Sequence, residues 1–359
     1  MNQQRWSAKR ANDWYAGLPW LVGCNFIPST AVNPIEMWQK ETFDPATIDR
    51  ELRWAADLGF NTVRVYLHDL VWRTGAGGLK ERIDRFLSMA TQRGIRTLLV
   101  LFDDCWHDNP AVGKQSAPVP GVHNSGWVQS PGRRAAVNTA YWPALEAYVT
   151  DILGAFGKDD RILMWDLYNE VGNIFLPTLS KPWTQKAFQL PWLILRHLLL
   201  PGATLPLLKK TFEWARSADP SQPLTSGVWF FDPPLNRYLL DTSDIITFHN
   251  YNDAANLSRQ IEKLKETGRP LVCTEYMARP QGSRFDTHLP IFKKERVGCY
   301  NWGLVSGKTQ THFSWKSKPG AAEPAPWFHD ILHPDGTPYD PTEADLIKTL
   351  TGANNQEQF

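Results

Sequence analysis

The sequence predicts an α/β fold of the (β/α)8 TIM-barrel type. Short apolar runs alternate with longer amphipathic segments, which is the pattern of repeated βα units around a parallel sheet. Eight such runs can be counted, as many as a closed barrel has strands. The chain has 359 residues, and barrels of this type routinely exceed roughly 250 residues as one unit, so we expect a single domain over 1–359.

The predicted strands are short, and each is followed by a polar or glycine-containing segment. They cover residues 21–27, 62–67, 96–102, 162–167, 224–229, 245–248, 271–274 and 298–302. Each strand but the last is followed by a crossover segment, as the barrel requires.

The predicted helices lie between the strands and end at glycine or proline. The first starts with Asp44 as cap and Pro45 in the first turn, and it ends before Gly59. The others cover 80–93, 134–156, 207–218, 233–240, 254–267, 286–296 and 341–350.

Two connections are too long for ordinary loops, namely 103–131 after strand three and 171–206 after strand four. Both leave the carboxyl ends of strands, where barrels carry their active sites, so we expect walls or a lid over a pocket. We interpret the apolar stretch 190–200 as an amphipathic helix on the barrel, in preference to an interface or membrane contact.

A C-terminal extension over 316–359 is expected to pack on the barrel. Its Trp327 and His329 could fold over the mouth of the pocket or clamp the barrel edge, and we favour the clamp.

The charge balance argues against a charged partner. There are 38 basic and 37 acidic residues, a formal net charge of +1, so we expect no nucleic acid or anionic membrane as partner. The most apolar stretch is too short to span a bilayer. Residues 1–10 are polar and lack a secretory signal, so we expect a cytoplasmic chain or a trimmed secreted or periplasmic one. The oligomeric state stays open.

The cysteines and histidines do not show the spacing of a metal site. Four cysteines, at positions 24, 105, 273 and 299, lie in or just after predicted strands without CxxC spacing, so we expect reduced, mostly buried thiols. No H-x-H, H-E-x-x-H or EF-hand spacing occurs, and we expect no metal and no other cofactor.

Two predicted strands end in glutamate. The segment 165–170 ends with Asn169 and Glu170, and the segment 270–274 is followed by Glu275. A lone glutamate at such a place is more often a solvated surface acid. Two at the ends of strands four and seven point into one barrel pocket, and paired carboxylates about 5 Å apart are the machinery of retaining glycoside hydrolysis. Asn169 could then donate a hydrogen bond to the sugar 2-hydroxyl.

With these residues the chain resembles the catalytic barrel of the clan A retaining glycoside hydrolases, most similar to families 5 and 2, over roughly residues 18 to 315. The resemblance implies that Glu170 is the acid/base and that Glu275 is the nucleophile. It also implies a partner for the nucleophile on strand two, which matches Arg64, whose guanidinium would favour an ionised Glu275.

The same resemblance implies further contacts after strands six and eight. His249 and Tyr251 match a histidine and a tyrosine whose hydroxyl touches the nucleophile, although a histidine considered alone could equally be a satisfied structural residue. Trp302 matches a tryptophan that forms the floor of the subsite for the non-reducing sugar. The chain has 17 Trp, 10 Tyr and 17 Phe, most of which we expect to fill the core while others serve as sugar platforms.

The chain departs from family 5 after strand three. The histidine expected there is replaced by the run Asp103-Asp104-Cys105-Trp106-His107. His107 or His68 could substitute for it. Asp103 or Asp104 could bind sugar hydroxyls or cap the loop.

These observations lead to a retaining β-glycoside hydrolase as the predicted function. The expected substrate is a neutral β-linked glucan, mannan, xylan or galactoside, and the long loops favour exo-action or short oligosaccharides. The alternatives are a non-catalytic carbohydrate-binding barrel and a transglycosylase that uses the same glycosyl-enzyme intermediate.

Overall fold

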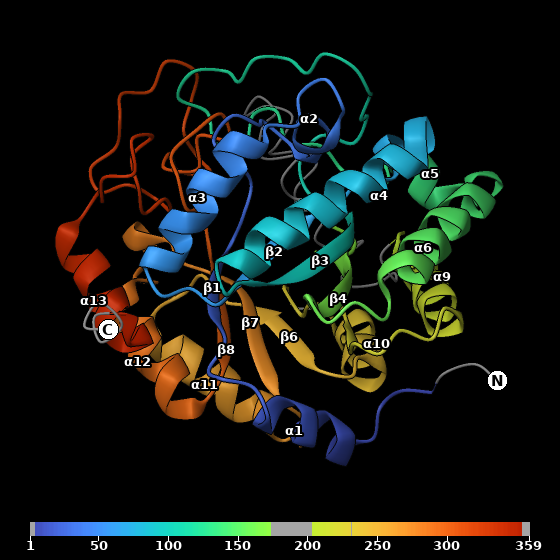
Figure 1. The fold of residues 1–359 in the computed structure, drawn as a ribbon. Coiled ribbons are helices and arrows are strands. Elements are labelled where there is room, and N and C mark those ends of the chain that lie inside the picture. The colour runs from blue at the N-terminus through green and yellow to red at the C-terminus, as the bar shows by residue number, and fades with distance from the viewer. Residues whose placement is uncertain (1–3, 174–202, 231, 354–359) are drawn as a thin grey trace, which may run out of the picture.

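The computed structural model describes residues 4–173, 203–230 and 232–353. Eight parallel strands form one sheet in the order β5-β4-β3-β2-β1-β8-β7-β6, and helices surround it (Figure 1). The bridge between Val228 and Phe248 joins the two outer strands of this order. The strands are β1 (Val22–Asn25), β2 (Thr62–Tyr66), β3 (Arg96–Asp103), β4 (Ile162–Asn169), β5 (Leu224–Thr225), β6 (Ile246–His249), β7 (Leu271–Tyr276) and β8 (Gly298–Trp302). The predicted TIM barrel is confirmed.

Strand five is much shorter than predicted. After Thr225 the chain leaves the ladder with β4, because the Ser226 hydroxyl donates to the Tyr168 carbonyl at 2.6 Å. The backbone N–H of Val228 then donates to the Thr247 carbonyl at 2.9 Å, which ties the segment to β6 instead. The segment predicted as one strand over 224–229 therefore forms hydrogen bonds first with β4 and then with β6.

The helices alternate with the strands as predicted. They are α1 (Ala8–Ala16), α2 (Pro34–Trp38), α3 (Pro45–Asp57), α4 (Asp69–Gln92), α5 (Arg133–Val137), η1 (Thr139–Tyr141), α6 (Trp142–Phe156), α9 (Leu205–Ser217), α10 (Pro233–Thr242), α11 (Ala254–Lys265), η2 (Arg279–Gln281), α12 (Phe285–Glu295) and α13 (Pro341–Thr351). Asp44 caps α3 as expected, since its carboxylate accepts the N–H of Thr47 at 3.1 Å, and Gly59 follows with a φ of 79°.

Two helix predictions differ from the structure. The helix expected over 80–93 begins earlier, at Asp69, where His68 caps it and accepts the N–H of Leu70. The helix expected over 134–156 is divided into α5, η1 and α6, because Asn138 is extended and Pro143 lies in the first turn of α6.

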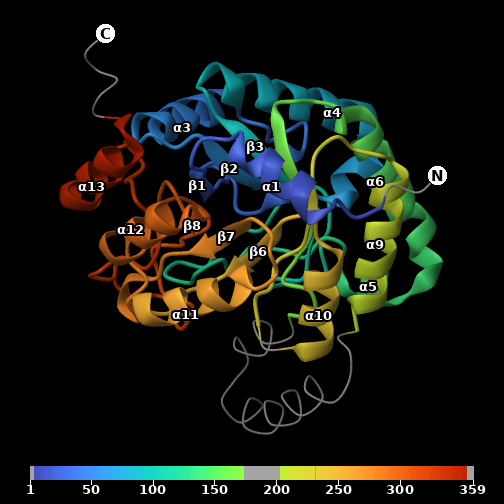
Figure 2. The ribbon, with the colours of Figure 1, turned by 90° about the horizontal axis from the view of Figure 1, so that it is seen from below.

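The helix α1 was not predicted, and it covers the amino-terminal end of the barrel (Figure 2). Ala11 and Tyr15 from α1 belong to the same buried cluster as Leu98 and Met164 from the strands. The sequence signal is weak because the helix has only nine residues and four of them are charged or amide side chains, although Ser7 caps it by accepting the N–H of Arg10.

At the opposite end, the segment after β3 and the segment after β8 lie side by side (Figure 1). The N–H of Asn124 donates to the Thr309 carbonyl, and the N–H of Gly320 donates to the Pro120 carbonyl, both at 2.8 Å. These two segments form one rim over the carboxyl ends of the strands.

The C-terminal extension packs on the barrel through α13 and the segment before it. Glu343 forms an ion pair with Arg279 at 2.6 Å. Within the extension, Trp327 stacks on Tyr339 with ring centroids 4.5 Å apart. The clamp that the sequence favoured stays a prediction.

Other predictions concern the cysteines and two parts of the chain. The four cysteines are free and buried. The predicted helix over 190–200 lies outside the described residues. In the part of the chain that the structure describes, no helix combines the length and apolarity needed to cross a membrane.

Candidate active site

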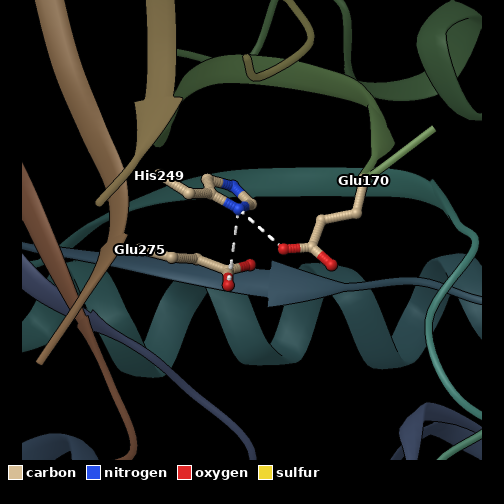
Figure 3. Close-up of side chains that lie close together, drawn as sticks. All are labelled: Glu170, His249 and Glu275. Atoms are coloured by element: carbon tan, nitrogen blue, oxygen red, sulfur yellow. Dashed lines mark hydrogen bonds and ion pairs between the residues drawn. The ribbon is translucent and has the colours of Figure 1, made fainter. Parts of the chain in front are cut away.

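Glu170, His249 and Glu275 meet at the carboxyl ends of β4, β6 and β7 (Figure 3). Nδ1 of His249 lies 3.0 Å from Oε1 of Glu170 and 3.6 Å from Oε2 of Glu275. Possible ligand atoms of all three side chains lie within 4.8 Å of one another. The two glutamates that the sequence placed at strand ends therefore face each other across one imidazole.

Glu275 is held by three further side chains. Its Oε1 accepts hydrogen bonds from Nη1 of Arg64 at 2.8 Å and from the Tyr66 hydroxyl at 3.0 Å. Its Oε2 accepts the hydroxyl of Tyr251 at 2.8 Å. This carboxylate is therefore fixed in position and lies beside a permanent cation.

Glu170 has different partners. Besides His249, its Oε2 accepts Nδ2 of Asn173 at 2.6 Å and the thiol of Cys105 at 3.1 Å. Burial alone would raise the pKa of Glu170, but the hydrogen bonds from His249, Cys105 and Asn173 hold it below its ordinary value. The backbone of Glu170 has a φ of 44°, which is unusual for a residue with a Cβ and is common at functional sites.

Arg64 connects the nucleophile side of the site to the strand-four side. It is fully buried, and its guanidinium donates to Glu275, to Oδ2 of Asp166 at 2.7 Å and to Oδ1 of Asn169 at 2.7 Å. Burial by itself lowers the pKa of Arg64, but Tyr66 and the carboxylates of Asp166 and Glu275 raise it well above the usual value. Asp166, Tyr66 and Asn25 are residues of this network that the sequence analysis did not assign to the site.

Asn169 lies behind the pocket wall and not in it. Its Nδ2 donates to Oδ1 of Asp103 at 2.9 Å, and it is 2% exposed. Burial raises the pKa of Asp103 to about 6, although the hydrogen bonds from Asn169 and Trp127 oppose the shift. These contacts orient the amide of Asn169 within the wall.

The acids after strand three are not among the described residues that line the cavity, and both have hydrogen-bond partners within the protein. Their binding to sugar hydroxyls stays a prediction. Asp104 is buried because it binds the loop after β4, accepting the Tyr168 hydroxyl, the N–H of Gly172 and the Thr204 hydroxyl at 2.6 to 2.7 Å. Asp103 binds Trp127 and Asn169 behind the wall. Both aspartates thus have the loop-fixing role that the sequence left open.

Neither histidine candidate replaces the one expected after strand three. Nε2 of His107 lies 2.8 Å from the Ser125 carbonyl, and Nε2 of His68 lies 3.0 Å from the Gln129 carbonyl. Neither residue lines the cavity. Cys105, which the sequence suggested only as a buried thiol, is the residue of this segment that reaches Glu170.

A cavity of ≈ 360 Å³ surrounds Glu170 and Glu275. Trp302 lines it as expected, together with His249 and Tyr251. The lining residues that the sequence analysis did not assign to the pocket are Cys105, Trp106, His123, Asn124, Trp127, Asn173, Trp229, Phe230, Asn252, Gln281 and Trp315, while His329 was one of the two alternatives for the tail. Aromatic faces dominate this wall, which suits the C–H faces of sugar rings.

Several of these residues come from the rim, and three of them, His123, Trp315 and His329, lie close together. His123 belongs to the segment after β3, and Trp315 and His329 follow β8. The His123 ring lies 5.3 Å from the ring of His329 and 6.5 Å from that of Trp315. Burial lowers the pKa of His123 to about 4 and that of His329 well below its usual value, so both rings are neutral.

The lining contains no lysine or arginine among the residues that the structure describes. The described chain offers one group of three possible metal ligands, which is Glu170, His249 and Glu275 itself. Since a retaining glycosidase uses both carboxylates directly, the expectation that no metal is needed stays a prediction.

Comparison with known proteins agrees with this geometry. The family description for cellulase (glycosyl hydrolase family 5) matches residues 27–317. A sequence search among curated proteins finds no significant match.

Solved structures of glycoside hydrolases share the fold at low identity. A GH5_18 variant from Streptomyces cattleya in complex with Manb1-4GlcNAc has 12% identity and a TM-score of 0.59, covering 94% of this chain and 81% of that one. An exo-β-1,4-mannosidase from Opitutaceae bacterium strain TAV5 has 16% identity and a TM-score of 0.59, covering 94% and 60%. An endo-1,4-β-D-mannanase from Thermotoga petrophila RKU-1 has 15% identity and a TM-score of 0.54, covering 92% and 99%. The chain belongs to glycosyl hydrolase family 5 and is a retaining glycoside hydrolase.

Proposed function

We propose that the chain hydrolyses uncharged β-linked oligosaccharides by double displacement, with Glu275 as nucleophile and Glu170 as acid/base. The observation that carries the assignment is the approach of the two carboxylates to within 4.8 Å across His249. Retaining glycosidases place these groups about 5 to 5.5 Å apart, whereas inverting ones need about 6.5 to 9.5 Å.

In the first step a carboxylate oxygen of Glu275 attacks the anomeric carbon while the bond to the leaving oxygen breaks. Glu170 gives its proton to that oxygen. A bound sugar excludes water from the pocket, which favours the neutral form of Glu170 that this step needs.

In the second step water attacks the anomeric carbon, Glu170 takes a proton from it, and Glu275 leaves as a carboxylate. Tyr251 and Arg64 contact Glu275 throughout and can stabilise the charge that returns to it.

The composition of the cavity wall supports a neutral sugar. The described lining residues supply aromatic faces and neutral donors but no cation to bind a sugar carboxylate. Several structural neighbours are named for mannose-containing saccharides, while others are β-glucuronidases, whose sugar carries a carboxylate. Because the described lining has no cation, β-1,4-linked mannosides are our first candidates. The rim formed by His123, Trp315 and His329 narrows the pocket and favours short chains or exo-action.

The test is a panel of aryl β-glycosides with manno, gluco, xylo, galacto and glucurono configuration, together with β-1,4-mannobiose and mannan. We expect turnover of a neutral glycoside, with mannosides preferred, and a first-formed product of β configuration by proton NMR. A product of α configuration would contradict the double displacement. Preference for the glucuronide would contradict the neutral-sugar assignment.

A further inference from the structure

We propose that Cys105 is a positioning residue for Glu170: its thiol holds the acid/base carboxylate as an uncharged hydrogen-bond donor, at the place where a histidine was expected. This inference rests on the role proposed for Glu170. It goes further by assigning a function to a side chain that the paired-carboxylate mechanism does not include.

The geometry around the sulfur supports the proposal. Sγ of Cys105 lies 3.1 Å from Oε2 of Glu170, and Nδ2 of Asn169 points to the same sulfur from 3.4 Å. Asn169 thus acts as a donor to sulfur, so the single thiol hydrogen is left for Glu170. The Cys105 N–H also donates to Oδ1 of Asp103 at 3.0 Å, which fixes the backbone that carries the thiol.

The thiol also lies in the right place to act on the reaction. Cys105 lines the cavity with Glu170 and is 7% exposed. Asn173 binds the same carboxylate oxygen at 2.6 Å, so Oε2 has two donors and Oε1 lies beside His249. Removal of the thiol would take one of these two donors away from Oε2 and leave the bond from Asn173.

A cysteine at this place differs from a histidine in charge. Burial raises the pKa of Cys105 well above that of an ordinary thiol, and the carboxylates of Asp103, Glu170 and Glu275 raise it further. The sulfur therefore stays protonated and neutral through the working pH range. A histidine there could become a cation and pull the proton balance of Glu170 toward the carboxylate.

The pH dependence follows from the groups that face Glu170. These groups are His249 at the end of β6, Tyr251 just after β6, Glu275 in β7 and Asp103 at the end of β3. These groups are the same in the native enzyme and in variants of Cys105. The thiol adds to them a hydrogen bond that stabilises the ionised form of Glu170. Its loss should raise the pKa of Glu170 and move the alkaline limb of kcat/KM to higher pH.

The experiment measures kcat/KM against pH for Cys105→Ala, Cys105→Val and Cys105→Ser, on the best aryl glycoside found for the native enzyme. We expect the two donor-free variants to shift the alkaline limb upward by ~0.5–1 pH unit. Cys105→Ser keeps a donor, so its limb should stay near that of the native enzyme. Cys105→His should move the limb downward, because it adds a titratable cation.

Cys24→Ala is the matched control. Cys24 is a buried cysteine on β1, so its replacement removes the same thiol volume from the barrel without touching Glu170. Its alkaline limb should not move. Melting temperatures of all variants show whether each one is folded.

Failure of this inference can be separated from failure of the proposed function by adding Glu170→Ala. If that variant loses most activity on poor leaving groups but little on dinitrophenyl glycosides, Glu170 is the acid/base. An unmoved alkaline limb in both donor-free variants would then overturn the role of Cys105 alone. If Glu170→Ala shows no dependence on the leaving group, the proposed function itself is wrong.

Discussion

The two carboxylates of the site are the same chemical group in two different surroundings. Glu275 lies against the permanent cation Arg64 and two tyrosine hydroxyls. Glu170 is bound by His249, Cys105 and Asn173, none of which carries a permanent charge. The first environment places a permanent positive charge beside the carboxylate, whereas the second surrounds it with neutral or titratable donors.

This difference teaches how one pocket can separate two roles. A nucleophile has to remain a carboxylate, and a buried guanidinium serves that need at every physiological pH. An acid/base has to change its protonation twice in each turnover, which a neutral or titratable donor permits. His249 contacts both residues, so the contrast lies in their other partners.

The largest effect should come from the nucleophile. Replacing Glu275 by Ala removes the covalent intermediate, and we expect kcat to fall by roughly 10⁵-fold or more, as for other residues that act as a unit in covalent catalysis. Added azide should restore turnover and give the α-glycosyl azide, because the azide attacks from the side that the carboxylate has vacated. Native-like activity, or a β-glycosyl azide product, would show that Glu275 is not the nucleophile.

The second effect concerns Glu170→Ala. We expect a fall of roughly 10²- to 10⁴-fold on glycosides with poor leaving groups and a much smaller one on dinitrophenyl glycosides, since the latter need no protonation. Azide should here give the β-glycosyl azide by attack on the glycosyl-enzyme. Product configuration by NMR compares the two glutamates directly, and identical azide products from both variants would mean that the roles are misassigned.

The third effect tests the cation on the nucleophile side. Arg64→Met leaves Asp166 and Glu275 buried without a cation, which should cost about 3–5 kcal/mol in free energy of unfolding. The control is Arg237→Met, because Arg237 is 87% exposed and lies 3.9 Å from Asp241, so little change is expected there. Urea unfolding of both variants measures the difference. Equal stabilities would show that Arg64 does not hold the two carboxylates.

The smallest effect uses Glu51, a third buried glutamate, outside the site. Burial raises its pKa to about 7, and hydrogen bonds from Ser29 only partly oppose the shift. Arg50 is 3.8 Å away and 40% exposed, so Glu51 has no close buried cation such as Arg64 provides for Glu275.

The sign for Glu51 follows from linkage. The pKa of Glu51 in the folded state lies above its ordinary value of 4.5, so its stabilising contribution is complete below about pH 4.5 and is lost as pH rises through about 7. Glu51→Gln stays neutral, so between pH 5 and pH 8 it should lose about 2–3 kcal/mol less stability than the native protein. Urea unfolding at both pH values tests this. If the free energy of unfolding changed equally with pH in both proteins, burial would not raise the pKa of Glu51.

The sequence predicted the barrel and the two glutamates for one reason. Buried strands leave apolar runs, and residues at the ends of β4 and β7 must face one pocket once the barrel is recognised. Arg64 and Tyr251 were implied by the family resemblance, as matches on β2 and just after β6, and the structure brings both to Glu275. The predictions of strand five and of the helix over 134–156 were less accurate. The segment after β5 forms hydrogen bonds with β6 instead of extending its pairing with β4, and Pro143 begins a new helix.

The rest of the site depends on loops, and loops carry no periodic signal. The sequence offered Asp104 and His107 as sugar contacts, and only the structure shows that they form tertiary hydrogen bonds with Gly172 and Ser125. It offered no reason to choose Cys105 over its neighbours, since only the folded segment after β3 places that thiol beside Glu170.

By itself, then, the sequence determined the barrel and the positions of Glu170 and Glu275, because both follow from where strands begin and end. Only the tertiary structure decided the partners of each carboxylate and the rim residues, such as His123 and Trp315, that narrow the pocket. The physical reason is that these contacts join segments far apart in the chain, and their geometry depends on how whole loops pack rather than on local spacing.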